Sequence, residues 1–238
     1  MAARGRPPEP TKAWERFLAW TGRAKGGGWI FRGHADRRWE LKPGFGRLDS
    51  YSPERERLSL LAFKQQAALF VDGRDLKDWE WLVLAQHHGL PTRLLDWTSN
   101  PLVACFFAVR DAMATSCDAE VVAIKVDSLD WLSERDLAES PYRLLEVRLL
   151  RPVQRFGRVH AQHGIFSVHP RPDIAWSGPT PARGPGARQS RFLVSTLWKR
   201  DFLQRLALFG IDEARLMGDL DGVASVLAWR LREKLSLE

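Results

Sequence analysis

Polar side chains of several chemical types are concentrated between residues 86 and 108, in a stretch that is otherwise apolar enough to be core. They are His87, His88, Thr92, Arg93, Asp96, Thr98, Ser99 and Asn100. Burying polar groups is costly unless they find partners, so such a mixture marks either a polar network or a binding site. This stretch is therefore the first candidate for function.

Arg32 is the second candidate, because it ends an apolar strand and can grip a phosphate through two parallel hydrogen bonds. Gly33 follows it, and a glycine lets a ligand approach the backbone closely. The alternative is a structural ion pair of Arg32 with Asp96 or Glu146. Asp96 can equally pair with Arg93 across the turn between them.

Metal and nucleophile chemistry receive less support. The histidines form no helical His-x3-His pair, and His160 and His163 would face opposite sides of a strand, so no metal site is predicted. A triad of Ser99, a histidine and Asp96 lacks the strand–Gly-x-Ser-x-Gly–helix elbow. The sequence has neither a phosphate loop nor a Gly-x-Gly-x-x-Gly fingerprint, and its two cysteines make no disulfide framework.

The elements around the first candidate can be read from local signals. Residues 93–97 form a short extended piece, and a helix begins near Asn100, which is a good N-cap residue. Pro101 suits the first helical position, and residues 102–109 are apolar on nearly every side, which predicts a buried helix. A strand that runs into a helix N-terminus can present hydroxyl and backbone N–H groups to a ligand.

Helical and strand periodicities alternate along the chain, which indicates an α+β fold. We expect residues 1–10 to be disordered, residues 11–238 to form a single domain, and residues 170–188, rich in proline and glycine, to be a mobile excursion. Helices are predicted at about 11–23, 52–71 (strongest over 56–71), 75–87, 100–109, 129–138, 199–209 and 221–235. Strands are predicted at about 29–34, 93–97, 119–126, 142–149, 165–169 and 191–198.

Composition is that of an ordinary globular protein, with 45% apolar residues among 238. No apolar stretch approaches the roughly 18 residues of a membrane helix. The N-terminus lacks the apolar segment of a signal peptide, so we expect a cytoplasmic protein that does not enter a membrane. The net charge of +7 favours a nucleic acid, nucleotide or phosphate partner. An arginine-rich genome composition accounts for the same charge equally well.

Several motifs together resemble the FRG domain family, which is named for the tripeptide found here as Phe31-Arg32-Gly33. The longest is Gln86-His-His-Gly-Leu-Pro-Thr-Arg-Leu-Leu-Asp-Trp-Thr98, followed by Asn100-Pro101-x-x-Ala104. Two later motifs resemble the same family, namely Arg158-x3-Gln162-x-Gly164-x-Phe166 and Gly210-Ile-x5-Met217-Gly-Asp-Leu-Asp-Gly222. The resemblance extends over residues 29 to 230 and implies a fold more than a function.

A second resemblance, to ADP-ribosyltransferases with an Arg–Ser–Glu arrangement, implies a function. In that family the arginine holds the phosphates of NAD, a serine motif supports the site, and a glutamate bonds the ribose 2′-hydroxyl. By position the glutamate corresponds to Gln162, since no Glu-x-Glu is present. An amide can still bond the ribose, but it stabilises developing positive charge less well than a carboxylate.

The same resemblance implies a set of site residues. The catalytic residues would be Arg32, Ser99 and Gln162, and the NAD-binding residues Arg32, Gly33, His34, Arg93, Thr98, Ser99 and Phe106. The fold that this resemblance implies is ADP-ribosyltransferase-like, with a central, mostly antiparallel sheet that is split or wrapped by helices. The first functional hypothesis is therefore a protein that binds NAD or a related nucleotide. Such a protein would transfer ADP-ribose to nucleic acid or protein, or hydrolyse NAD, as a defence or toxin effector. The second hypothesis is a non-catalytic module that binds nucleic acid or a nucleotide.

Overall fold

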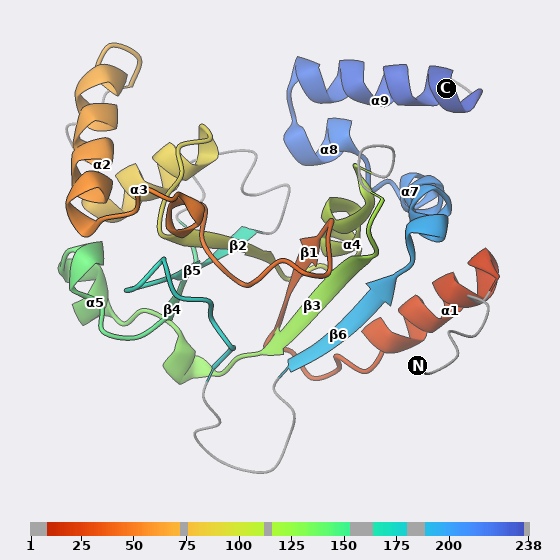
Figure 1. Cartoon of the computed structure of the whole chain (residues 1–238), viewed down its shortest axis with the longest axis horizontal. Helices are drawn as coiled ribbons and strands as arrows, with labels where there is room; N and C mark the ends of the chain where they lie inside the picture. The colour runs from red at the N-terminus through yellow and green to blue at the C-terminus, as the bar shows by residue number, and fades with distance from the viewer. Residues whose placement is uncertain (1–8, 72–75, 112–115, 153–163, 180–188, 236–238) are drawn as a thin grey trace.

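An antiparallel sheet of six strands forms the centre of the computed structural model (Figure 1). The structure describes residues 9–71, 76–111, 116–152, 164–179 and 189–235. The strands lie in the order β4–β5–β2–β1–β3–β6, and every neighbouring pair is antiparallel. Their bounds are β1 Trp29–His34, β2 Leu94–Thr98, β3 Ala119–Lys125, β4 Arg148–Leu150, β5 Gly164–Val168 and β6 Gln189–Val194. The expected α+β fold with a central antiparallel sheet is confirmed.

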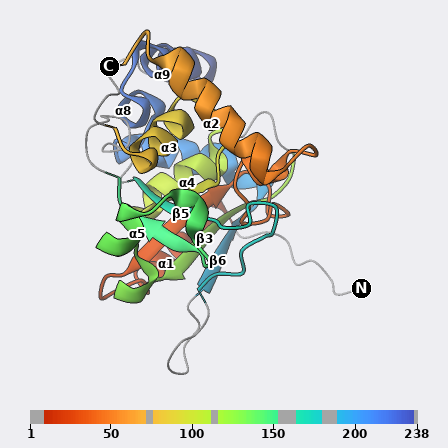
Figure 2. The ribbon, with the colours of Figure 1, turned by 90° about the vertical axis from the view of Figure 1, so that its left-hand side faces the viewer.

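Helices cover the sheet in two groups. Their bounds are α1 Pro10–Thr21, α2 Pro53–Ala67, α3 Asp78–His87, α4 Pro101–Val109, α5 Glu134–Ala138, α7 Lys199–Leu208, α8 Glu213–Met217 and α9 Leu220–Glu233. In Figure 1, α1, α4 and α7 lie on the side of β1, β3 and β6, whereas α2, α3 and α5 lie on the side of β2, β4 and β5. The view from that second side shows α8 and α9 above α4 (Figure 2).

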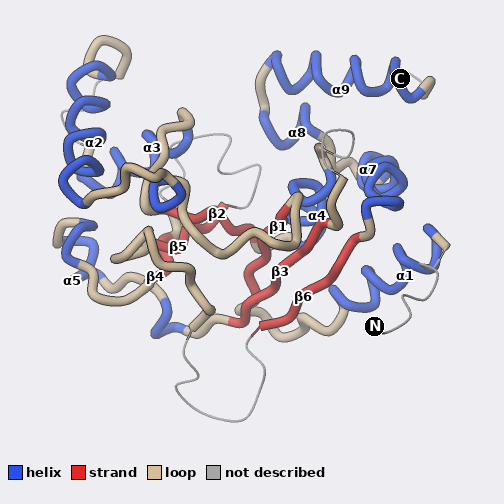
Figure 3. Tube along the Cα trace, viewed as in Figure 1, coloured by secondary structure: helices blue, strands red, loops and turns tan. Residues whose placement is uncertain are grey.

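The sheet is weakly joined between β1 and β2. These strands share one register pair, Phe31 with Thr98, whereas β1 and β3 share six. Two apolar clusters lie one on each half: one contains Phe31 and α4, and the other contains Leu94 and α3. A third cluster, with Ile30 of β1 and Leu95 of β2, joins the halves. The two halves of the sheet therefore diverge beyond Phe31, towards the ends of β1 and α3 (Figure 3).

The junction between β2 and α4 forms as the sequence predicts. The Asn100 side chain accepts a hydrogen bond from the backbone N–H of Leu102 at 2.9 Å, and Pro101 occupies the first helical turn. Thr98 Oγ1 accepts the backbone N–H of Asn100 at 3.1 Å, which fixes the turn before the helix. The helix itself is buried, because six of its nine residues are inaccessible to solvent.

Several predicted elements differ in the structure. The strand expected at 191–198 ends at Val194 and is followed by a 3-10 turn over residues 196–198. The strand expected at 142–149 is reduced to β4, because Ser140 caps a 3-10 turn that begins at Pro141. The helix expected at 129–138 is a 3-10 turn followed by α5. The last helix is preceded by the separate helix α8, because Gly218 takes a left-handed conformation and Asp219 caps α9.

Two further expectations fall largely outside the described residues. Of the disordered N-terminus expected at 1–10, only Glu9 and Pro10 are described, and they begin α1. Of the excursion expected at 170–188, residues 170–179 are described and contain neither helix nor strand. Within the described ranges, no helix has the length and apolar character that crossing a membrane requires.

Candidate functional site

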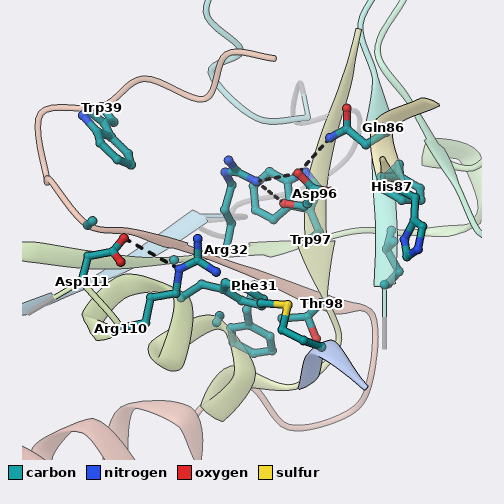
Figure 4. A pocket seen from close by; sticks show the side chains of 18 residues that line it. Phe31, Arg32, Trp39, Gln86, His87, Asp96, Trp97, Thr98, Arg110 and Asp111 are labelled. Atoms are coloured by element: carbon teal, nitrogen blue, oxygen red, sulfur yellow. Dashed lines mark hydrogen bonds and ion pairs between the residues drawn. The ribbon is translucent and has the colours of Figure 1, made fainter. Parts of the chain in front are cut away.

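A cleft of about 390 Å³ lies where β1 and β2 diverge (Figure 4). The ends of α3 and α4, the loop after β1, and β5 complete its walls. Its lining residues are Phe31, Arg32, Gly33, Ala35, Trp39, Gln86, His87, Asp96, Trp97, Thr98, Ala104, Phe107, Arg110, Asp111, Gly164, Ile165, Phe166 and Met217. Charged, amide and aromatic side chains thus meet at one place in the sheet.

Arg32 bridges the two diverging strands. Its Nη1 donates a hydrogen bond to the backbone oxygen of Asp96 at 2.6 Å and lies 3.7 Å from Asp96 Oδ2. Its Nε donates to Nε2 of His34 at 3.2 Å. Burial lowers the pKa of Arg32 to about 10, although the charge of Asp96 opposes this shift. The guanidinium is therefore still a cation at neutral pH, and its orientation is fixed.

His34 supports Arg32 from inside the protein. Its side chain is fully buried, and its Nδ1 has no hydrogen-bond partner among the described residues. Burial lowers its pKa to about 3, and the charge of Arg32 acts in the same direction. The imidazole is therefore neutral at pH 7, and its Nε2 must be the unprotonated nitrogen because it accepts from Arg32.

Asp96 is the most open charged group beside Arg32, with a side chain that is 59% exposed. Gln86, at the end of α3, donates from Nε2 to Asp96 Oδ2 at 3.0 Å. Gln86 Oε1 in turn accepts from the buried hydroxyl of Thr92 at 2.7 Å. Both ends of the amide are used, so Gln86 holds the carboxylate of Asp96 in place (Figure 4).

Aromatic rings form much of the remaining wall. Trp39 stands on the loop after β1 and is 46% exposed, which is unusual for so large an apolar side chain. The guanidinium of Arg47 lies 5.8 Å from the centre of the Trp39 ring, and Arg110 lies 5.3 Å from that of Phe107. The cleft thus combines cations with exposed π-faces, a combination suited to a planar, anionic ligand.

Comparison with known proteins identifies the segment that builds this cleft. The family model of the FRG domain matches residues 27–117. These residues are an FRG domain. The two later motifs, within residues 158–166 and 210–222, lie outside the matched segment. No curated protein and no solved structure matches the chain.

The FRG domain supplies most of the cleft. All lining residues fall within the matched segment except Gly164, Ile165, Phe166 and Met217. The tripeptide that names the family contributes all three of its residues, and the long central motif contributes Gln86 and Asp96, among others. The two motifs singled out in the sequence therefore meet in space at the diverging strands.

Gly33 has a different reason for being glycine than the sequence suggested. A Cβ added there would lie 2.0 Å from the backbone oxygen of Ala104 and 2.6 Å from the nitrogen of Ala108. The backbone of α4, not a ligand, is therefore what approaches Gly33 closely. Gly33 still lines the cleft, but its first role is to let the helix pack directly on β1.

Arg93 lies outside the cleft lining and forms a buried ion pair. Its Nε and Nη2 donate to the two carboxylate oxygens of Glu56 at 2.7 and 2.6 Å. Both side chains are 3% exposed, and the guanidinium lies 4.4 Å from the centre of the Tyr142 ring. The expected role of Arg93 in binding NAD is therefore not supported by its position, and its partner is Glu56, not Asp96.

Of the other expected site residues, some line the cleft and others do not. Thr98 lines the cleft, whereas Ser99 is exposed in the turn before α4 and is absent from the lining. Phe106 points into the core and a small cavity beside α7, and its neighbour Phe107 is the cleft residue. Gln162 lies outside the described residues, so its proposed role stays a prediction.

Serine and histidine do meet in the structure, but away from the cleft. Ser167 Oγ lies 2.8 Å from Nε2 of His169, and Trp97 Nε1 donates to the same oxygen at 2.9 Å. All three side chains are buried, so this chain of hydrogen bonds positions Trp97 within the core. Among the described residues there is no cluster of histidine, cysteine or carboxylate side chains able to hold a metal ion.

Sequence reasoning missed several cleft residues. The motifs do not single out Trp39, and they give Asp96 only as a polar residue of the central stretch, a partner for an arginine or a member of a triad. The ion pair of Arg32 with Asp96, one of the alternatives from the sequence, is present. The exposure of Trp39 and Asp96 depends on how far the two halves of the sheet diverge, which no local pattern encodes.

Proposed function

We propose that the FRG domain binds NAD, or a related nucleotide, in the cleft between β1 and β2. The observation that carries this proposal is the position of Arg32, which is a fixed cation beside a carboxylate and in the same cleft as the exposed ring of Trp39. A guanidinium can bind phosphate oxygens, and an aromatic ring can stack on a base or a nicotinamide. The cleft volume of 390 Å³ falls within the range of about 300–1,000 Å³ that ligand pockets have.

The reaction proposed for bound NAD is cleavage of the bond between ribose C1′ and the nicotinamide nitrogen. The bonding electron pair passes to the ring, and nicotinamide leaves as a neutral molecule. Water, or a nucleophile on a protein or nucleic acid, bonds to C1′ and gives up a proton. Positive charge develops on the ribose during this step, and a nearby carboxylate or amide dipole stabilises it. Gln162 is proposed to supply the amide.

The test is incubation of the purified protein with NAD, followed by chromatographic measurement of nicotinamide. The assay is run with and without DNA, RNA and cell extract, which supply candidate acceptors. Arg32→Ala should abolish binding and release of nicotinamide. Arg143→Ala removes an arginine that is 75% exposed and outside the cleft, so it should behave as the parent. If the parent neither binds nor cleaves NAD under any of these conditions, the proposal is rejected.

A non-catalytic module that binds nucleic acid is the second candidate, favoured by the net charge of +7. Some arginines are engaged in ion pairs, for example Arg38 with Asp36 and Arg191 with Glu120, but the net charge already counts these carboxylates. Binding to DNA or RNA that falls steeply as salt rises would support this function. Absence of binding at low salt would mean that the high arginine content reflects genome composition alone.

A further inference from the structure

Asp96 has hydrogen-bonding capacity that the described residues leave unused. Its Oδ2 accepts from Gln86 and faces Arg32, but its Oδ1 has no hydrogen bond within the described part of the chain. An ionised carboxylate only accepts hydrogen bonds and has about four acceptor positions. The open side of Asp96 therefore calls for a ligand that donates.

The chemistry of Asp96 excludes one part of a nucleotide and favours another. A phosphate placed on this carboxylate would be repelled by it, whereas hydroxyl groups would donate to it in charge-assisted bonds. The vicinal 2′- and 3′-hydroxyls of ribose present two such donors side by side. A carboxylate that bonds the ribose 2′-hydroxyl is a known device of nucleotide-binding sites.

We propose that Asp96 binds the vicinal diol of a ribose, so that the cleft selects ribonucleotides over 2′-deoxyribonucleotides. This inference rests on the proposed function, because it assigns the sugar to the cleft in which Arg32 holds the phosphate. Nη1 of Arg32 lies 3.7 Å from Oδ2 of Asp96. The two side chains are therefore close enough for one nucleotide to place its 5′-phosphate on Arg32 and its diol on Asp96. The carboxylate is thus a specificity-determining residue beside the phosphate-binding cation.

Gln86 is the positioning residue for this carboxylate. Its amide is fixed by Thr92, a residue with 2% exposure whose hydroxyl also accepts the backbone N–H of Leu94 at 3.0 Å. The hydrogen bonds therefore run from the backbone of β2 through Thr92 and Gln86 to Asp96. Selectivity should depend on Gln86 even though Gln86 need not touch the sugar.

The experiment compares the affinities of adenosine 5′-monophosphate and 2′-deoxyadenosine 5′-monophosphate by calorimetry. The parent should bind the ribonucleotide about ten- to a hundredfold more tightly, as the loss of one hydrogen bond to a charged group implies. Asp96→Asn should bring this ratio close to one without weakening the deoxynucleotide, and Gln86→Ala should lower the ratio in part. Because Asp96 is 59% exposed, its substitution leaves the fold intact.

Glu139→Gln is the matched control, because it removes a half-exposed carboxylate that lies outside the cleft and pairs with Arg143. It should leave the ribose-to-deoxyribose ratio unchanged. A ratio near one in the parent, or a ratio kept by Asp96→Asn, overturns the inference. NAD binding without sugar preference would reject this role of Asp96 alone. Sugar preference without NAD binding would support this role of Asp96 and reject NAD as the ligand of the cleft. Failure to bind any nucleotide would reject both.

Discussion

Arg32 Nη1 donates a hydrogen bond to the backbone oxygen of Asp96 across a distance of 2.6 Å. The two strands that carry these residues pair through their backbones only at Phe31 and Thr98. The guanidinium therefore joins β1 to β2 beyond the point at which the ladder ends, and it supplies a donor to a carbonyl of the diverging strand. Among the described residues its Nη2 makes no hydrogen bond, which leaves that group for a ligand.

Substitution of Arg32 separates its structural role from its proposed binding role. Arg32→Ala should abolish nucleotide binding and lower the free energy of unfolding by about 1–3 kcal/mol, since the buried Nε2 of His34 and the backbone oxygen of Asp96 lose their donor. Arg32→Lys keeps the charge but not the forked geometry, and should weaken binding about tenfold. Calorimetry and urea unfolding measure the two effects. A much larger loss of stability, with no nucleotide bound by the parent, would make Arg32 a structural residue only.

Local signals in the sequence were sufficient for most of the fold. Asn100 and Pro101 marked the start of α4 correctly, and the apolar run after them gave its burial, because capping and burial are encoded in a few neighbouring residues. The strand predicted at 142–149 was wrong for a related reason. Its apolar residues looked like a strand, but Ser140 and Pro141 start a 3-10 turn there.

The candidate site was only partly predictable. The sequence identified Arg32 because an arginine at the end of an apolar strand is conspicuous. It also placed Arg93 in that site, whereas the partner of Arg93 is Glu56, 37 residues earlier in the chain. Long-range pairing of this kind depends on how α2 packs against β2. Hydrophobic periodicity gives the buried face of a helix but not its neighbour.

The contact between β1 and α4 makes Gly33 intolerant of any side chain. Gly33→Ala would place its Cβ 2.0 Å from the backbone oxygen of Ala104, and the helix must move to relieve this overlap. We expect a loss of about 2–4 kcal/mol in the free energy of unfolding, measured by urea titration. Gly22→Ala is the control, because the nearest atom to its Cβ is 3.4 Å away. Equal stability of the two variants would mean that α4 does not pack on Gly33 as described.

The buried pair of Arg93 and Glu56 should be stabilising only as a pair. Glu56→Gln leaves the Arg93 charge without its counterion in a site that is 3% exposed. Such a loss typically costs about 3–5 kcal/mol. The double variant Glu56→Leu, Arg93→Leu removes both charges and should be more stable than Glu56→Gln alone. If Glu56→Gln unfolds at the same urea concentration as the parent, the pair contributes nothing to the fold.

Acid should destabilise the protein through its two buried neutral histidines. Burial lowers the pKa of His34 and of His169 to about 3, from an ordinary value of 6.5. Between those two values the unfolded chain binds more protons than the folded protein, so the stability falls as the pH falls from 6.5 towards 3. Above that window this contribution is complete and constant. Each histidine changes the stability by at most about 1.4 kcal/mol per pH unit.

His34→Gln tests this contribution, because glutamine can accept from Arg32 and does not titrate. The free energy of unfolding, measured in urea from about pH 7 to about pH 5, should fall less in this variant than in the parent, by about 1–2 kcal/mol over the range. His88→Gln removes an exposed histidine and should keep the slope of the parent. If His34→Gln keeps that slope as well, His34 is not held neutral by the fold. In that case a hydrogen bond to a neutral His34 would not explain the fixed orientation of Arg32.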